Sequence, residues 1–343
     1  MSKLNTIFFL GTLILSGLIY SQFNLIGYGF SQLNGQLNIL WNSRPIDEVL
    51  GDSTVHDTIK QKLILIQEIK AFAVDSLGIK KSKNYSSYFD QQNKPLLYVL
   101  TGAPEFEMKS YEWKFPFLGK VSYKGFFKEE AGRLEEKELI KNGYDTDLGT
   151  VGAWSTLGWF NDPILSGMLK RNEGNLANLI IHELTHGTLY VKDNVEFNEN
   201  LASFIGEKGA IEFLKNKYGE ESLELRKYRE NKSDDEIFSN YILKGANQLD
   251  SLYKSFNNSS SIELKRREKL LLINKITEGV NQLNLFNKKK YLYIVSFATT
   301  EKNTFFMSYM RYKSEQSLLE KEFKKYGNLK DYLKALKQKY NSV

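Results

Sequence analysis

The segment Ile180-Ile181-His182-Glu183-Leu184-Thr185-His186 is the most informative part of this chain. The sequence contains three histidines, and two of them stand four residues apart here, with a glutamate directly after the first. Apolar residues around the pair predict a helix that is buried in the protein. On a helix that turns by about 100° per residue, His182 and His186 lie about 40° apart, so both imidazole rings can reach one cation.

The H-E-x-x-H spacing is typical of zinc metallopeptidases. Glu183 projects about 60° away from His186, which places its carboxylate beside a bound cation without making it a ligand. Zinc lowers the pKa of a water molecule that it binds to about 7, and a neighbouring carboxylate can accept the proton of that water. The motif therefore predicts one Zn2+ per chain, with His182 and His186 as ligands and Glu183 as the general base. The alternative is a helix whose histidines face polar surface or bind carbonyl groups.

A third zinc ligand is expected downstream of the motif. A metzincin would carry Gly and His three and six residues after the second histidine, but Leu189 and Lys192 occupy these positions. That class of peptidase is therefore excluded. Four carboxylates remain as candidates for the ligand: Asp193, Glu196, Glu199 and Glu207.

Glu199 is the preferred candidate because it opens a second predicted helix, Asn198 to Glu207. One face of this helix carries small residues behind the carboxylate, since Ala202, Ser203 and Gly206 follow Glu199 at i+3, i+4 and i+7. Such a face lets the helix approach the histidine helix closely, while Glu196 precedes the helix and Glu207 faces away. The alternative for Glu199 is a first-turn glutamate that the helix dipole favours.

The run Phe197 to Ala202 after the histidine motif resembles the gluzincin pattern of H-E-x-x-H followed by N-E-x-x-A. More closely, the chain is similar to a bacterial family of predicted zinc aminopeptidases. The runs that carry this likeness are Gly35 to Leu37, Trp113 to Pro116 with Gly119, Tyr123 to Phe127 and Ala153 to Pro163. The likeness extends roughly from Gly27 to Lys337. Trp154 and Gly187 depart from the usual family residues, but neither is a proposed ligand. The resemblance implies a gluzincin-like fold and an aminopeptidase activity.

Composition narrows the class of protein further. The chain has 343 residues, of which 41% are hydrophobic, so it can bury a sizeable core. Its net charge of +6 comes from lysines spread along the sequence, and no aromatic-basic stripe or nucleic-acid fold signature accompanies them. We therefore expect no nucleic acid partner, while the histidine motif predicts a peptide substrate. Cysteine is absent, which excludes disulfides, thiolate catalysis and a Cys-based zinc site.

The N-terminus predicts export. Lys3 precedes fourteen uncharged residues, 7–20, which is the pattern of a signal sequence or membrane anchor over residues 1–26. Leu15-Ser16-Gly17 resembles the start of a lipoprotein box, but Leu18 replaces the cysteine to which lipid would be attached. Lys3 on the inside places residues 27–343, the predicted metallopeptidase domain, outside the cytoplasm, in the periplasm or at the cell surface and held at the membrane. The alternative is a core helix at the N-terminus.

The remaining pattern predicts an α+β protein that is mostly helical. Apolar spacing predicts helices over 30–42, 55–77 and 129–142, and β-rich runs predict strands over 94–100, 119–126 and 146–153. This α+β portion ends at about residue 170 and leads into zinc helices within 172–210. The chain from Ala202 onward reads as nearly all helix, with a loop at 257–261. The run Val151 to Gly158 is the candidate sheet edge for the substrate backbone.

Other residues receive weaker assignments. Tyr309 and Tyr312 share a helix face at i, i+3 and are candidate donors to the oxyanion, although an aromatic stripe at the edge of the core is the preferred interpretation of each tyrosine. His56 is expected at the surface or capping a helix, and the turn Asn161 to Pro163 to cap the helix that follows it. The prediction is a zinc-dependent aminopeptidase. The alternatives are an endopeptidase with the same site and a catalytically silent zinc-containing binding protein.

Overall fold

The computed structural model describes residues 23–115, 119–150, 161–257, 259–313 and 315–341, and the chain forms two compact units, 1–43 and 44–343. The described part of the first unit is a helix, α2 (Phe23–Trp41), which begins earlier than the predicted helix at 30–42. The predicted anchor run, 7–20, lies outside the described residues. Among the helices that are described, none combines the length and the apolar character that crossing a membrane requires.

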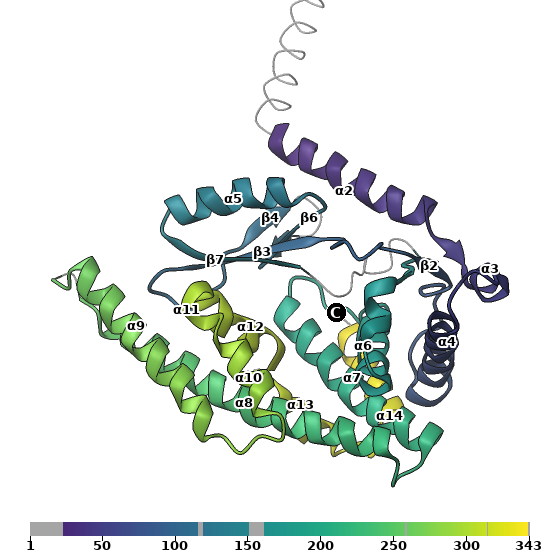
Figure 1. Ribbon diagram of the computed structural model, residues 1–343. Helices are drawn as coiled ribbons and strands as arrows, with labels where there is room; N and C mark the ends of the chain where they lie inside the picture. The colour runs from purple at the N-terminus through teal and green to yellow at the C-terminus, as the bar shows by residue number, and fades with distance from the viewer. Residues whose placement is uncertain (1–22, 116–118, 151–160, 258, 314, 342–343) are drawn as a thin grey trace, which may run out of the picture. The chain divides into compact units, whose positions relative to one another are not determined.

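The second unit is mostly helical, with short strands in its first half, so the predicted α+β class is confirmed (Figure 1). The strands are β1 (Arg44–Pro45), β2 (Ser87–Phe89), β3 (Tyr98–Pro104), β4 (Trp113–Phe115), β5 (Gly119–Val121), β6 (Lys124–Phe126), β7 (Tyr144–Thr150) and β8 (Ile164–Leu165). The helices up to the proposed site are α3 (Ile46–Gly51), α4 (Asp57–Leu77), α5 (Glu129–Lys141), the 3-10 helix η1 (Ser166–Lys170), α6 (Glu173–His186) and α7 (Val195–Tyr218).

Helices make up nearly all of the chain after α7, as predicted from Ala202 onward. They are α8 (Leu223–Ser255), α9 (Ile262–Gly279), the 3-10 helix η2 (Val280–Gln282), α10 (Lys288–Val295), α11 (Ala298–Glu301), α12 (Asn303–Lys313), α13 (Gln316–Phe323) and α14 (Leu329–Asn341). The predicted loop at 257–261 falls between α8 and α9. Its Ser261 caps α9 by accepting a hydrogen bond from the N–H of Leu264 at 3.2 Å.

The main sheet has the order β6-β3-β7 and is antiparallel throughout, with Tyr98 opposite both Phe126 and Thr150. Helix α5 covers one face of this sheet, and α12 lies against the other (Figure 1). The approach of α5 is close, because a Cβ atom on Gly132 would lie 2.9 Å from Cδ1 of Leu148. A second sheet, β1-β2-β8, and the hairpin β4-β5 complete the strands.

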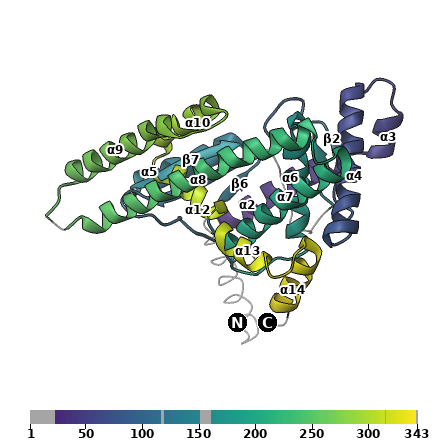
Figure 2. The ribbon, with the colours of Figure 1, turned by 90° about the horizontal axis from the view of Figure 1, so that it is seen from below.

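Two hydrophobic clusters form the core of this unit. The first surrounds α6 and α7 and includes residues of α4, α13 and α14, and the second lies between α8, α9, α10 and α12. Helix α8 joins them (Figure 2), because its Leu225 and Tyr228 belong to the first cluster and its Phe238 and Ile242 to the second. The helix that follows α7 therefore ties the two cores together.

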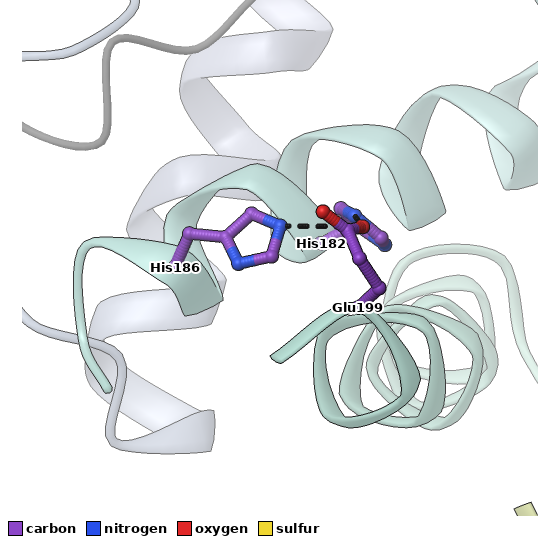
Figure 3. A group of neighbouring side chains, drawn as sticks. All are labelled: His182, His186 and Glu199. Carbon is purple, nitrogen blue, oxygen red and sulfur yellow. Dashed lines mark ion pairs between the residues drawn. The ribbon is translucent and has the colours of Figure 1, made fainter. Parts of the chain in front are cut away.

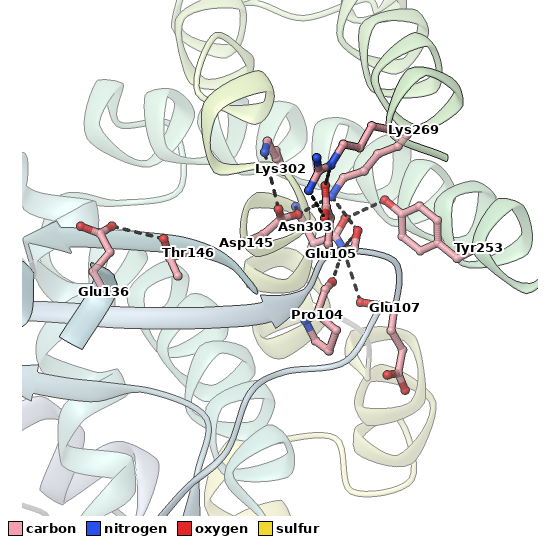
Figure 4. Close-up of polar contacts among 11 residues, drawn as sticks. Pro104, Glu105, Glu107, Glu136, Asp145, Thr146, Tyr253, Lys269, Lys302 and Asn303 are labelled. Atoms are coloured by element: carbon pink, nitrogen blue, oxygen red, sulfur yellow. Dashed lines mark hydrogen bonds and ion pairs between the residues drawn. The ribbon is translucent and has the colours of Figure 1, made fainter. Parts of the chain in front are cut away.

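A buried polar network fixes the main sheet to the second cluster (Figure 4). The ammonium group of Lys269 on α9 forms an ion pair with the Asp145 carboxylate on β7, and both side chains are almost fully buried. Lys269 also donates to the carbonyl of Glu105 at 2.7 Å. Asn303, the first residue of α12, donates its backbone N–H to Asp145 at 3.1 Å and accepts from the Tyr253 hydroxyl of α8 at 2.7 Å. The Asp145 carboxylate thus binds groups from α9 and α12, and α8 joins the network through Asn303.

Two sequence-based assignments near the strands differ from the structure. The strand predicted at 94–100 lies at 98–104, and the turn Asn161 to Pro163 does not cap a helix, because it leads into strand β8. The side chain of Asn172 caps α6 instead, by accepting from the N–H of Asn175 at 2.9 Å. The candidate sheet edge, 151–158, lies outside the described residues.

Candidate metal centre

Helix α6 carries both histidines on its last two turns, and His186 is its last residue. Apolar side chains such as Ile180, Ile181 and Leu184 are buried in the first cluster and anchor this end of α6. The side chains of His182 and His186 are 16% and 5% exposed, so both are largely buried. Their rings are 5.0 Å apart between centroids and nearly perpendicular.

Helix α7 brings a carboxylate to the two imidazoles because its small residues allow a close approach to α6. A Cβ atom on Gly206 would lie 2.6 Å from Oδ1 and 2.9 Å from the carbonyl of Asn178, and 3.2 Å from the Cβ of His182. Ala202 and Ser203 on the same face are buried as well. The small-residue face predicted behind Glu199 is therefore confirmed.

The three predicted ligand side chains converge on one point (Figure 3). An oxygen of Glu199, Oε2, lies 3.4 Å from Nε2 of His182 and 3.7 Å from Nε2 of His186. The three ligand atoms all lie within 4.8 Å of one another. In the described part of the chain, no other group of three or more His, Asp or Glu side chains is arranged in this way.

The charges of these three residues are strongly coupled. Burial favours the neutral form of Glu199, but hydrogen bonds and charge from the two histidines outweigh it and lower the pKa of the carboxyl group. Burial opposes protonation of His186, yet Glu199, with a further contribution from Glu183, raises the pKa of the imidazole. The carboxylate is thus held ionised, as a metal ligand must be, and a cation would compete with protons for His186.

The other carboxylates considered as third ligands lie elsewhere. Asp193 and Glu196 are exposed to solvent. Glu207 points to α8, where its Oε1 accepts a bond from Lys232 at 3.0 Å, as expected for a residue that faces away. Glu196 lies within the first turn of α7 rather than before it, because this helix begins at Val195, three residues ahead of the predicted start.

Two asparagines that flank Glu199 fix the start of α7. The side chain of Asn198 accepts from the N–H of Val191 at 2.8 Å and donates to its carbonyl at 2.7 Å, which pins the loop between α6 and α7. Asn200 is fully buried; it donates to the carbonyl of Arg311 at 2.7 Å and accepts from the N–H of Glu315 at 3.1 Å. Sequence reasoning gave neither residue a role, although both stand beside the predicted ligand.

The remaining predicted residues are spread over the fold. Tyr309 packs against the second cluster, with its ring centroid 5.6 Å from that of Phe238. The side chain of Tyr312 is not among those that the structure describes. His56 caps α4 by accepting from the N–H of Thr58 at 3.2 Å, so its predicted capping role is confirmed. Tyr190, which was not predicted, lies beside the site with its ring centroid 6.3 Å from that of His186.

Glu183 is half-buried on α6, next to His182 in sequence. Its negative charge acts on His186, on the guanidinium group of Arg171 and on the phenol of Tyr85. The carboxylate therefore lies among polar groups from three segments of the chain without belonging to the set of three ligand atoms. Its role as a general base stays a prediction.

The fold and the site together define a mostly helical α+β protein with a candidate metal centre built from two helices. The family model described as "Putative aminopeptidase" matches residues 27–341, and the chain belongs to this family. This match supports the resemblance inferred from the sequence and indicates a peptidase. No curated protein and no solved structure matches the chain.

Proposed function

We propose that this protein is a zinc-dependent peptidase in which His182, His186 and Glu199 bind one Zn2+. The observation that carries the proposal is the convergence of two imidazole nitrogens and one carboxylate oxygen within 4.8 Å. Two imidazoles and a carboxylate are a ligand set that catalytic zinc accepts, with a fourth position left for water or substrate. The lowered pKa of Glu199 agrees with this role, because a carboxylate binds a metal in its ionised form.

The chain's own residues would then perform the proton transfers. When bound, zinc supplies a Lewis acid that polarises water and the substrate carbonyl. Glu183 accepts the proton of the attacking water on a carboxylate oxygen and passes it to the nitrogen of the leaving amine. Tyr190, at the rim of the site and 42% exposed, is placed to contact the substrate. The gluzincin-like architecture and the candidate oxyanion donors Tyr309 and Tyr312 remain proposals.

The proposal is tested by Glu183→Gln. The substitution removes the base but no ligand, so we expect a folded protein with about one zinc per chain and a kcat that is lower by roughly 10²–10⁴-fold. Metal analysis and hydrolysis of a peptide series measure both quantities. Glu212→Gln, a carboxylate further along α7, is the matched control and should leave both unchanged. Equal hydrolysis by Glu183→Gln and wild type would exclude this mechanism.

The same peptide series decides between an aminopeptidase and an endopeptidase. The family description favours an aminopeptidase, which releases single N-terminal residues and spares peptides with a blocked amine. Cleavage of blocked, internally quenched peptides would favour the endopeptidase. A protein that binds zinc but hydrolyses no peptide would instead be a binding protein.

We infer from the sequence that the protein is exported and held at the membrane by its N-terminal segment. Lys3 followed by the uncharged run 7–20 supports this location, because positive charge at the start of an apolar segment remains in the cytoplasm. Residues 27–343 should then be digested by protease added to intact spheroplasts and should sediment with membranes. Recovery of full-length, protease-resistant chain in the cytosol would contradict the inference.

A further inference from the structure

Tyr85 is a tyrosine whose hydroxyl group is buried without a hydrogen-bond partner in the described part of the chain. The residue is fully inaccessible and belongs to the first hydrophobic cluster, together with Ile180 and Leu184 of α6. A buried hydroxyl without a partner is unfavourable, and such groups are few in native proteins. The position of this hydroxyl therefore needs an explanation other than packing.

The backbone of Tyr85 is held in an unusual conformation. Its φ of 60° lies in the left-handed region, which is uncommon for a residue with a large side chain. Hydrogen bonds fix it on both sides, because its N–H donates to the carbonyl of Asp162 at 2.6 Å and its carbonyl accepts from Gln67 at 2.8 Å. Backbone strain that neighbouring contacts enforce is concentrated at functional sites.

Two carboxylates act electrostatically on the phenol of Tyr85. Beyond the effect of burial, the negative charges of Glu183 and Asp162 disfavour ionisation of the phenol and raise its pKa, with Glu183 the stronger of the two. Towards an ionised carboxylate, a neutral phenol can act only as a hydrogen-bond donor. Ile180 and Leu184, which belong to the same cluster as Tyr85, stand one turn before Glu183 and directly after it on α6.

We propose that Tyr85 is a positioning residue for Glu183, to whose carboxylate its hydroxyl donates a hydrogen bond in the zinc-loaded protein. One carboxylate oxygen is then held on the buried side, and the other is directed at the attacking water. The inference rests on the proposed function, since it gives Glu183 the role of general base. It also explains why a strained backbone places a tyrosine, rather than a phenylalanine, at this point of the core.

The test is Tyr85→Phe in the full-length, zinc-loaded chain, which removes only the hydroxyl group. We expect kcat to fall by about 10- to 100-fold, as for a misplaced catalytic group, with KM within about twofold and zinc content unchanged. In a Glu183→Ala background the same substitution should not lower kcat further. Unchanged kcat in Tyr85→Phe would overturn the proposal.

Unfolding by urea provides a second readout that does not depend on activity. If Tyr85 donates to Glu183, Tyr85→Phe lowers the unfolding midpoint of the zinc-loaded protein when Glu183 is present and not in the Glu183→Ala background. A hydroxyl that has no partner gives no loss in either background, because its removal relieves an unsatisfied group. An equal loss in both backgrounds would assign the hydroxyl to Asp162. Both of these results contradict the proposal.

Tyr332→Phe is the matched control. Tyr332 is also fully buried in the first cluster, but its hydroxyl lies 3.1 Å from Glu322, on α13. We expect Tyr332→Phe to lower the urea unfolding midpoint equally with Glu183 present and in the Glu183→Ala background, and to leave the kcat of the wild-type background unchanged. If the wild-type protein hydrolyses no peptide, the proposed function fails, while the urea series still decides whether Tyr85 and Glu183 are coupled.

Discussion

At the scale of single residues, the position of Glu199 depends on its two asparagine neighbours. Asn198 holds the loop that precedes α7, and Asn200 holds the end of α12 against the helix. Both amides use donor and acceptor groups at once, so rotation of either side chain would break more than one hydrogen bond. Glu199 lies between these two asparagines, so its carboxylate extends towards the histidines from a turn of α7 that hydrogen bonds hold rigid. A preorganised ligand is held in this way.

The ligand assignment leads to a prediction for zinc binding. Replacement of His182, His186 or Glu199 by Ala removes one of three protein ligands, so each variant should lose most of its zinc while the remainder of the fold persists. Asp193→Ala and Glu196→Ala are the controls, because both carboxylates are exposed and lie outside the group of ligand atoms. Metal analysis after dialysis measures the difference. Full zinc in Glu199→Ala together with loss in either control would refute the assignment.

These residues also show what the sequence can predict about a site. His182 and His186 lie within one helix, and Glu199 follows on the next, so helix periodicity was sufficient to predict that these three side chains converge. Asn200 bonds to Arg311, a contact across 111 residues. The proposed partner of Tyr85 is Glu183, which also stands on a distant segment of the chain. Local periodicity carries no information about such contacts.

At the scale of elements, the site depends on how closely α6 and α7 pack. Gly206 lies opposite Asn178, and Gly209 lies opposite Leu77 and Ile181, so side chains fill the space next to both glycines. The carboxylate and the imidazoles can therefore meet without a long side chain between them. The predicted zinc helices within 172–210 correspond to these two elements, although α7 continues to Tyr218.

Gly206→Ala tests this packing. The added Cβ would meet the backbone carbonyl of Asn178 at 2.9 Å, a contact that real Cβ atoms essentially never make, so α7 must shift away from α6. We expect a loss of stability of about 1–3 kcal/mol, as for other overpacked positions, and weaker zinc binding. Gly187→Ala is the control, since its Cβ would lie 3.7 Å from the nearest atom. Denaturation and competition with a chelator should separate the two variants; equal zinc affinity would contradict the expectation.

Strand boundaries were less predictable than helices. The strand expected at 94–100 begins instead at Tyr98, because Gln92 and Asn93 adopt positive φ values and Pro95 has no N–H to donate to a ladder. The strand continues through Gly102 to Pro104, residues that rarely favour a strand, because β7 pairs with them as far as Tyr144. Pairing with a partner 40 residues away in sequence, Pro104 with Tyr144, sets this boundary, and composition alone does not reveal it.

At the scale of the second unit, 44–343, buried polar contacts join the main sheet to the second hydrophobic cluster. Asp145 is the centre of these contacts, since it accepts from Lys269 of α9 and from the backbone of α12. The sequence did not indicate this network, because its members come from five separate segments of the chain. A buried ion pair is weak evidence for stability by itself, but removal of one partner leaves a buried charge uncompensated.

Lys269→Met should therefore be strongly destabilising. Methionine fills the space of the lysine stem, but the Asp145 carboxylate then keeps only the N–H of Asn303 at 3.1 Å and the ammonium group of Lys302 at 3.8 Å. We expect the free energy of unfolding in urea to fall by about 3–5 kcal/mol. The side chains of Lys269 and Asp145 are only 4% and 3% exposed, so water cannot take the place of the lost ammonium group beside the Asp145 carboxylate.

Arg266→Met is the matched control for this prediction. Arg266 stands on the same helix and pairs with Glu105 at 2.6 Å, but its side chain is 59% exposed. Because solvent screens such a pair, its removal should change the free energy of unfolding by no more than about 1 kcal/mol. Zinc content should be unchanged in both folded variants, since the ligands lie on α6 and α7. Equal destabilisation by the two substitutions would show that Asp145 does not depend on Lys269, and that other contacts hold the sheet to the second cluster.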